Sequence, residues 1–336
     1  MKEILKKLLI LRSPNIGPVT YNKLLAKYGD IDSVIESLNL NQDFIDSVKR
    51  EMDMADDLGI QYIADDDVCY PKNLLQIKNH PIVISVRGNI DTLSKKCVSM
   101  VGTRHSTLAG MNFISDLATK FAEHNFAVVS GMAMGTDTAA HIGALKTHGN
   151  SQTIAVLAGG VDYIWPLENE SLYYEILERG LIISDMPVGS KPNATLFVQR
   201  NQWVAGLSDM LIIGEADMKS GSMTTARFAL DYGKNVFAVP GHPSDPRSVG
   251  PNSLIKNGSA TLCMSGKDFF NEEKIQKNKK NVSYGNDILD KLGMIPVSES
   301  VLANIVKKSV SEIKADLVVL ELQGLIRKQD GGYVLN

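Results

Sequence analysis

The sequence has few cysteines and no long apolar run. Its 336 residues include three cysteines, Cys69, Cys97 and Cys263, which lie far apart and form no C-x-x-C pair. This pattern argues against a disulfide framework and against a zinc site built on cysteines. No stretch approaches the roughly 18 apolar residues of a membrane-spanning helix, and the N-terminal apolar segment has no small-residue cleavage site. We therefore expect a cytoplasmic protein that makes no membrane contact.

The chain also lacks an excess of positive charge and the common catalytic motifs. Its formal net charge is −3 and its isoelectric point is near 6.1, so a polyanion would have to bind in a local pocket. The six histidines are scattered, and H-E-x-x-H, G-x-S-x-G and G-K-[S/T] are absent. We therefore expect no metal ion, no cofactor, no catalytic residue and no turnover.

The length, at roughly 150 residues per domain, favours more than one domain. Residues 1–75 show helical periodicity and predict a small helical domain. Within it, the segment S-P-N-I-G-P-V at 13–19 is typical of the turn in helix-hairpin-helix modules, whose backbone amides can contact DNA phosphates. A plain packing turn is the favoured interpretation here, because the surrounding charge is acidic.

Residues 76–270 alternate short apolar runs with helical patterns. We expect strands at 82–86, 97–101, 127–129, 153–157, 181–183, 210–213 and 236–239, with helices at 109–123, 136–146, 169–178 and 223–232. Apolar strands separated by amphipathic helices predict a parallel sheet with helices on both faces. The expected fold class is α/β, a doubly wound, Rossmann-like parallel sheet.

The C-terminal part differs in composition. Residues 271–285 are polar and lysine-rich, as in a solvated linker. In 286–336, helical patterns at 288–292, 299–306 and 310–322 are followed by a hairpin around Gly331 and Gly332, and Ser309 with Glu312 fits a capping box. Three helices and a β-wing predict a winged-helix module.

Glycine and small hydroxyl residues follow the predicted strands. The segments are 102–106, 130–137, 158–162, 220–224, 240–242 and 248–252. In a doubly wound sheet the carboxyl ends of the strands share one edge, where backbone amides and helix N-termini can hold an anion. These loops therefore predict a phosphate-binding groove, although they contain no G-x-G-x-x-G dinucleotide motif.

Four charged or titratable residues stand out beside these loops. Arg104, two residues after a strand-end glycine, could grip a phosphate with paired donors, and Arg200 is a second candidate. For both, a salt bridge to a neighbouring carboxylate is the alternative. Asp137 and His141, four residues apart, could form an acid-base pair, but a capping aspartate with a packing histidine is the favoured interpretation.

The strand-end motifs resemble those of the DprA/Smf family of bacterial DNA-processing proteins. They are V-G-T-R-H-S-T-L-A-G (101–110), V-S-G-M-A-M-G-T-D-T-A-A-H-I-G-A-L (129–145), A-G-G-V-D-Y-I-W-P-L-E-N (158–169), R-N-Q-W-V-A-G-L-S (200–208), S-G-S-M-T-T-A (220–226), V-F-A-V-P-G (236–241) and G-P-N-S-L-I-K-N-G (250–258). The resemblance implies a sterile-alpha-motif-like (SAM-like) N-terminal domain, an extended Rossmann fold and often a winged-helix tail. It also implies binding of single-stranded DNA as a homodimer through the Rossmann-like domain, and loading of the RecA recombinase in natural transformation.

The resemblance assigns DNA and phosphate contacts to Gly102, Arg104, Ser106, Ser130, Gly131, Gly135, Asp137, Arg200 and Asn201. The other expected contacts are Thr103, Gly159, Gly160, Gly221, Ser222, Gly241, Asn252 and Lys256. Val198, Gln199 and Gln202 depart from the family pattern, in which proline and basic residues are frequent. Tyr163, Trp165, Phe197 and Trp203 could stack on bases, with core packing as the alternative.

Two other functions remain open at this point. Nucleotide phosphoribohydrolases place a glycine-rich phosphate loop on a similar sheet. Their P-G-G-x-G-T-x-x-E motif is absent here and is matched only in part by Gly159, Gly160 and Asp162. A structural interaction protein with a vestigial pocket is the third hypothesis. In the predicted winged helix, residues 310–322 are mostly acidic among their polar positions, which favours protein contact over DNA contact.

Overall fold

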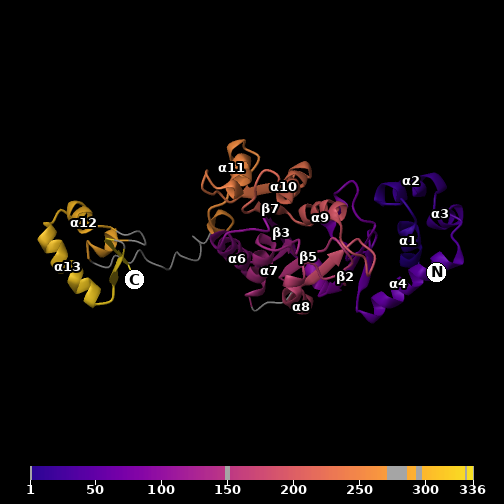
Figure 1. Cartoon of the computed structure of the whole chain (residues 1–336), viewed down its shortest axis with the longest axis horizontal. Coiled ribbons are helices and arrows are strands. Elements are labelled where there is room, and N and C mark those ends of the chain that lie inside the picture. The colour runs from indigo at the N-terminus through magenta and orange to yellow at the C-terminus, as the bar shows by residue number, and fades with distance from the viewer. Residues whose placement is uncertain (1, 148–151, 271–285, 293–296, 330, 336) are drawn as a thin grey trace. The chain divides into compact units, whose positions relative to one another are not determined.

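The structure is a computed structural model that describes residues 2–147, 152–270, 286–292, 297–329 and 331–335. The chain divides into two compact units, Met1–Phe269 and Phe270–Asn336. The N-terminal helices and the large sheet therefore belong to one unit (Figure 1). Boundaries at 75 and 270 between three domains stay predictions. In the described part of the chain, no helix combines the length and apolar character that crossing a membrane would need.

The N-terminal helices form a small layer around their own core. They are α1 (Glu3–Arg12), α2 (Pro18–Tyr28), α3 (Ile31–Ser37) and α4 (Gln42–Asp57). Leu8, Leu9 and Ile10 are almost fully buried among them. The Asn41 side chain caps α4 by accepting a 2.8 Å hydrogen bond from the Phe44 amide. The expected helical domain is present over 3–57, but the expectation fails beyond Gly59, where the chain enters a strand.

In the described part of the chain, one sheet has nine strands in the order β1-β2-β6-β5-β4-β3-β7-β8-β9. The strands are β1 (Gln61–Ala64), β2 (Val83–Gly88), β3 (Lys96–Val101), β4 (Phe126–Ser130), β5 (Thr153–Val156), β6 (Leu181–Ser184), β7 (Met210–Ile213), β8 (Asn235–Ala238) and β9 (Thr261–Leu262). The seven expected strands are all present. The short edge strands β1 and β9 were not expected.

The sheet is parallel only from β6 to β9. Strand β2 pairs antiparallel with β6, and β1 pairs antiparallel with β2, so the expectation of a wholly parallel sheet is wrong at this end. A parallel connection needs a crossover that usually includes a full helix. The helix between β1 and β2, α5 (Lys72–Leu75), has only four residues. It is too short for such a crossover, and β2 runs antiparallel to β1.

Helices cover both faces of the sheet, as expected. They are α6 (Leu108–Glu123), α7 (Thr136–Leu145), α8 (Glu170–Arg179), α9 (Ala194–Leu207), α10 (Gly221–Asp231) and α11 (Val249–Lys256), with short 3₁₀ turns at Ile90–Ser94, Leu167–Asn169, Pro246–Ser248 and Gly266–Asp268. Figure 1 shows α9 and α10 on one side of the sheet and α7 and α8 on the other. Helix α9 was not expected, although its buried residues recur with helical spacing.

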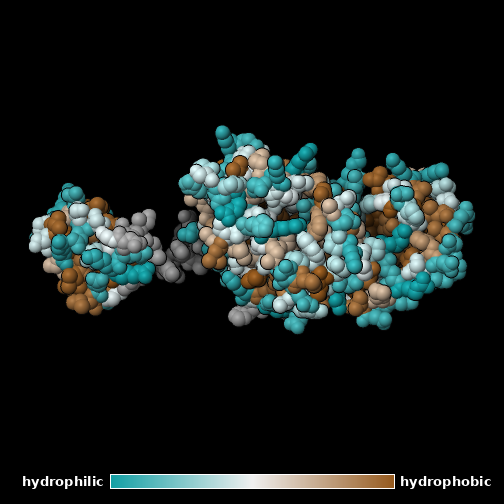
Figure 2. Space-filling view, viewed as in Figure 1, coloured by the Kyte–Doolittle hydropathy of each residue, from teal (hydrophilic) through white to brown (hydrophobic). Residues whose placement is uncertain are grey.

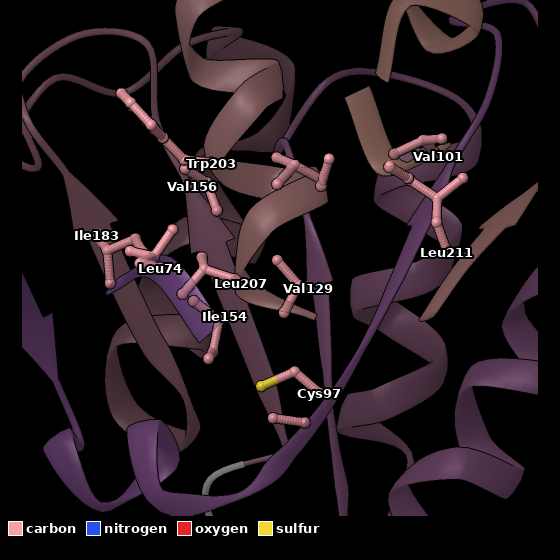
Figure 3. Close-up of a cluster of buried hydrophobic side chains, with 14 of the residues drawn as sticks. Leu74, Cys97, Val101, Val129, Ile154, Val156, Ile183, Trp203, Leu207 and Leu211 are labelled. Carbon is pink, nitrogen blue, oxygen red and sulfur yellow. The ribbon is translucent and has the colours of Figure 1, made fainter. Parts of the chain in front are cut away.

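The order of the strands reverses beside β3. The chain runs from β3 outward to β4, β5 and β6, then returns to the other side of β3 to form β7 and β8. Such a topological switch point leaves a crevice at the carboxyl ends of the two central strands. Buried side chains from β3, β4, β5 and β7 pack with α9 beneath it (Figure 3). The core therefore holds the crevice on a rigid base.

The C-terminal unit has its own small core. Helices α12 (Glu299–Val306) and α13 (Val310–Leu322) pack with a hairpin of β10 (Ile326–Gln329) and β11 (Gly332–Leu335). The helix expected at 288–292 is a 3₁₀ turn, Leu289–Lys291, and the Ser309–Glu312 capping box is present. Figure 2 shows hydrophobic areas on the surface of this unit. Its assignment as a winged helix stays a prediction, and the linker expected at 271–285 lies outside the described residues.

Candidate functional site

A cavity of about 260 Å³ lies at the switch point. The loops after β3, β4 and β7 and the helices α9 and α10 supply its walls. The lining residues that the sequence predicted are Gly102, Thr103, Arg104, Gly131, Asp137, Arg200, Asn201, Gly221 and Ser222. Residues from four stretches of sequence, 101–105, 131–137, 200–204 and 217–225, thus meet at one edge of the sheet.

The β3 and β4 loops are locked together at the cavity wall. The Thr136 amide donates to the Thr103 carbonyl at 3.2 Å, and the Ser106 and Thr136 hydroxyls share a hydrogen bond of 2.8 Å. Gly135 has φ +78°, and a Cβ there would lie 2.5 Å from the Thr103 carbonyl oxygen. Gly135 is therefore required by both backbone conformation and space.

Residues that follow β7 form hydrogen bonds with the same loop after β3. The Thr103 amide donates to the Glu215 carbonyl at 2.6 Å, and the Ser222 hydroxyl donates to the Gly102 carbonyl at 2.6 Å. Ser222 belongs to the first turn of α10, whose N-cap is Ser220. The first amides of a helix have no partner within the helix and favour an anion, so this end of α10 adds positive potential to the cavity.

Arg104 is exposed and lies over two aromatic rings. Its Cζ atom is 5.0 Å from the centroid of the Trp165 ring and 5.4 Å from that of Phe197. The two rings are themselves 4.6 Å apart. Across the described residues Arg104 forms no ion pair within 4 Å, so the salt-bridge alternative does not hold. Cation–π contact orients the guanidinium without neutralising it.

Arg200 is a buried counterpart on α9. Its Nη1 donates to the Gly131 carbonyl and, at 2.8 Å, to the Val156 carbonyl. Burial lowers the pKa of Arg200 to about 10, against the opposing effect of Asp137. Its Nε has no hydrogen-bond partner among the described atoms. Arg200 therefore ties the ends of β4 and β5 to α9 and adds positive charge to the cavity wall.

Asp137 and His141 do not form an acid-base pair. His141 is fully buried, and its Nδ1 shares a 2.7 Å hydrogen bond with the Thr153 hydroxyl. Burial lowers the pKa of His141 to about 3, so the ring is neutral at pH 7. Burial also raises the pKa of Asp137, while Arg200 lowers it. The packing interpretation of His141 agrees with this geometry.

The other predicted contacts do not line this cavity. They are Ser106, Ser130, Gly135, Gly159, Gly160, Gly241, Asn252 and Lys256. Most are held by local hydrogen bonds: the Ser130 hydroxyl donates to the Met100 carbonyl, and the Asn252 amide bonds to the backbone of Gly241. Gly159 borders a small void with Trp165 and Phe197. Lys256 is exposed in the last turn of α11.

The sequence argument missed part of the lining, namely Val101, His105, Ala133, Val204, Asp217, Ser220 and Thr225. Helical spacing of Arg200, Trp203, Val204 and Leu207 was the signal that could have located α9. The departures at Val198, Gln199 and Gln202 all line a different groove, of about 680 Å³, with Gly17 and Pro18 of the N-terminal turn. They leave the lining of the strand-end cavity unchanged.

Comparison with known proteins identifies the family. A family model described as DNA recombination-mediator protein A matches residues 61–274, and a DprA-like N-terminal HHH domain matches residues 1–43. The DNA processing protein DprA of Bacillus subtilis is 34% identical over 82% of this chain and 88% of its own length. The Smf protein of Escherichia coli is 30% identical over 92% and 89%. The match to the Smf protein of Synechocystis covers 51% of that protein.

Solved structures agree with this assignment. The DNA processing protein A of Streptococcus pneumoniae superposes with a TM-score of 0.68 and 30% identity, over 80% of this chain and 97% of its own. That of Helicobacter pylori, described for its unique single-stranded DNA binding mode, has a TM-score of 0.58 and 32% identity over 64% and 97%. The fold, the ordered strand-end motifs and the extent of these matches lead to one conclusion: the chain belongs to the DprA/Smf family of DNA-processing proteins.

Proposed function

We propose that this protein binds single-stranded DNA in the strand-end cavity, without sequence preference, protects it and loads RecA onto it during natural transformation and recombination. The observation that carries the proposal is Arg104, an exposed guanidinium held over Trp165 and Phe197 at the topological switch point. The DNA binding mode named for the Helicobacter pylori relative supports the same ligand.

Phosphates would be held by Arg104 together with backbone amides. Gly102 presents backbone at the end of β3, where the Thr103 amide is already bonded to the Glu215 carbonyl, and Gly221 and Ser222 form the first turn of α10. Amide and guanidinium donors recognise phosphate oxygens that are the same for every base. This explains how a chain of net charge −3 can bind a polyanion. Asp137, as a buried carboxyl, would orient Arg200 rather than contact DNA.

Bases would stack on the exposed faces of Trp165 and Phe197. Both rings are only partly buried and already carry Arg104 on one side. Stacking on an aromatic face is tolerant of sequence, and single strands offer unpaired bases that a duplex does not. We therefore expect preference for single-stranded over double-stranded DNA.

Membership of the family also leads us to propose a homodimer and RecA as the protein partner. The edge strand β9 carries exposed apolar side chains at Leu262 and, just beyond it, Met264, and an unpaired sheet edge can join a second copy. This supports a homodimer through the Rossmann-like domain. The family description as a recombination mediator supports RecA as the partner.

The test is a fluorescence-anisotropy titration of labelled oligo(dT) and of a duplex of equal length. Arg104→Ala should weaken single-strand binding about tenfold to a hundredfold, since it removes a charge-assisted phosphate contact and a stacking partner. Arg227→Ala is the matched control: it removes an exposed guanidinium two residues along α10 from the cavity-lining Thr225, on the opposite side of that helix.

Three results would contradict the proposal. They are equal affinity for the two forms of DNA, equal losses in the two variants, or no loss at Arg104→Ala. A parallel incubation with AMP tests for turnover, and release of adenine would favour a nucleotide hydrolase over a binding protein.

A further inference from the structure

A second, larger cavity opens at the other end of the central strands. Its volume is about 540 Å³, within the range of roughly 300–1,000 Å³ that small-ligand sites occupy. It is lined by the amino ends of β3 and β5, the end of α9, the Ile90–Ser94 turn and the loop that enters α5. The cavity lies wholly within the first compact unit.

The floor of this cavity is apolar. Ile154 of β5 is fully buried and Leu207 of α9 nearly so, and the partly buried Leu93 packs against the same core. Cys97 at the start of β3 is also buried. Figure 3 shows Cys97 and Val101 well apart, toward the two ends of β3. An apolar body of small-ligand size would be shielded from water on this floor.

The lining carries more positive than negative charge. Lys72, Lys95 and Lys96 all lie on it, opposed by Asp91 and Asp209. Asp209 is already engaged, since its carboxylate accepts hydrogen bonds from the Asn73 side chain at 3.2 Å and from the Cys97 amide at 3.3 Å.

Lys72 and Lys96 are the exposed members of this set. Lys95 donates to the Gln152 side chain at 3.2 Å. Burial lowers the pKa of Lys95, so an anion brought beside it would stabilise its charged form. Charge complementarity therefore selects an anionic group at the mouth.

This cavity is separate from the candidate DNA site. Lys96 and Cys97 begin β3 and line the second cavity, whereas Val101 ends β3 and lines the first. Cys97 and Val101 are four residues apart on β3, and at about 3.3 Å per residue this separates the two linings by about 13 Å along the strand. A ligand here would not occupy the phosphate contacts around Arg104.

We propose that this cavity is a binding site for a small amphipathic anion, an apolar ring or chain that carries one carboxylate, sulfonate or phosphate group. The apolar body lies on Ile154, Leu207 and Leu93, and the anionic group meets the exposed Lys72 and Lys96. The proposal is independent of the DNA-binding function.

The chain contains its own reporter for the site. Cys69 is exposed and lines the cavity, while Cys97 and Cys263 are buried. Iodoacetamide, a small neutral thiol reagent, should therefore label Cys69 selectively in the folded protein, and mass spectrometry can follow the rate. An occupant of the cavity should slow that reaction several fold.

The test uses 8-anilinonaphthalene-1-sulfonate as the probe, with the full chain. We expect saturable fluorescence enhancement, slower labelling of Cys69, and no displacement by saturating oligo(dT). The double variant Lys72→Glu/Lys96→Glu should weaken probe binding at least fivefold. Lys23→Glu/Lys27→Glu, two exposed lysines on α2 outside the cavity lining, makes the same charge change and should leave binding unchanged.

The neutral analogue N-phenyl-1-naphthylamine separates charge from apolar contact, and its binding should be nearly equal in both double variants. The proposal is overturned if the sulfonate probe leaves the rate of Cys69 labelling unchanged, if oligo(dT) displaces it, or if the two double variants bind it equally. A loss of DNA binding in Arg104→Ala would not bear on these outcomes, because Arg104 does not line this cavity.

Discussion

The two arginines of the strand-end cavity and two lysines of the C-terminal unit, Lys308 and Lys314, handle positive charge in opposite ways. In the cavity, Arg104 lies on aromatic faces and Arg200 donates to backbone carbonyls. In the C-terminal unit, Lys308 pairs with Asp316 at 2.9 Å and Lys314 pairs with Glu299 at 3.5 Å. The first arrangement leaves a cation available to a ligand, and the second neutralises it.

This difference shows why net charge is a poor guide to nucleic-acid binding. An aromatic face or a carbonyl orients a guanidinium but does not cancel its charge, whereas a carboxylate does. Availability of the charge at a fixed place therefore matters more than the number of basic residues. The two regions can be compared by removing each in turn.

The largest effect is expected when the buried charge is removed, in Arg200→Leu. This variant leaves the Gly131 and Val156 carbonyls without their side-chain donor and leaves the buried Asp137 without a nearby cation. We expect a loss of about 3 kcal/mol in the free energy of unfolding. Both tryptophans, Trp165 and Trp203, lie in the first compact unit, so urea unfolding followed by their fluorescence reports on that unit alone.

The matched variant for this measurement is Arg104→Ala. Its side chain is exposed and makes cation–π contacts, so we expect a change of no more than about 0.5 kcal/mol. Equal unfolding midpoints for Arg200→Leu and wild type would show that the buried guanidinium is not a structural tie between β4, β5 and α9.

A smaller effect is expected from salt. If two phosphates are neutralised, log affinity for single strands should fall with log salt at a slope of about −1.4, which is about a sevenfold loss between 50 and 200 mM. Arg104→Ala should make the slope shallower by about 0.7, because one phosphate contact is lost. A slope several times steeper would mean that dispersed surface lysines, and not the cavity, carry the binding.

Much of the central fold follows from local patterns. The seven apolar runs became strands within one or two residues of their expected ends, because a buried parallel strand leaves a continuous apolar signature. The direction of β2 could not be read in the same way. Direction depends on the connection to β1, and a short helix such as α5 does not stand out in the sequence.

The site was only partly predictable for a related reason. Glycines after strands indicated the edge at which ligands bind, and Gly102, Gly131 and Gly221 do line the cavity. Which strand-end residues face the cavity depends on tertiary packing. Ser130 ends β4 and Gly160 follows β5, yet their hydrogen bonds go to the Met100 and Ser190 carbonyls instead. The aromatic support of Arg104 joins residues 61 and 93 positions further along the chain, which no local pattern reveals.

The smallest effect is expected when the C-terminal unit is removed. Deleting residues 286–336 takes away Lys308 and Lys314, which are already paired with carboxylates, and leaves the cavity intact. Single-strand affinity in the anisotropy assay should therefore stay within a few fold of wild type. The exposed apolar residues Val318 and Leu322 on α13 instead fit a protein contact. A hundredfold loss on deletion would place DNA contacts in this unit and reverse the comparison.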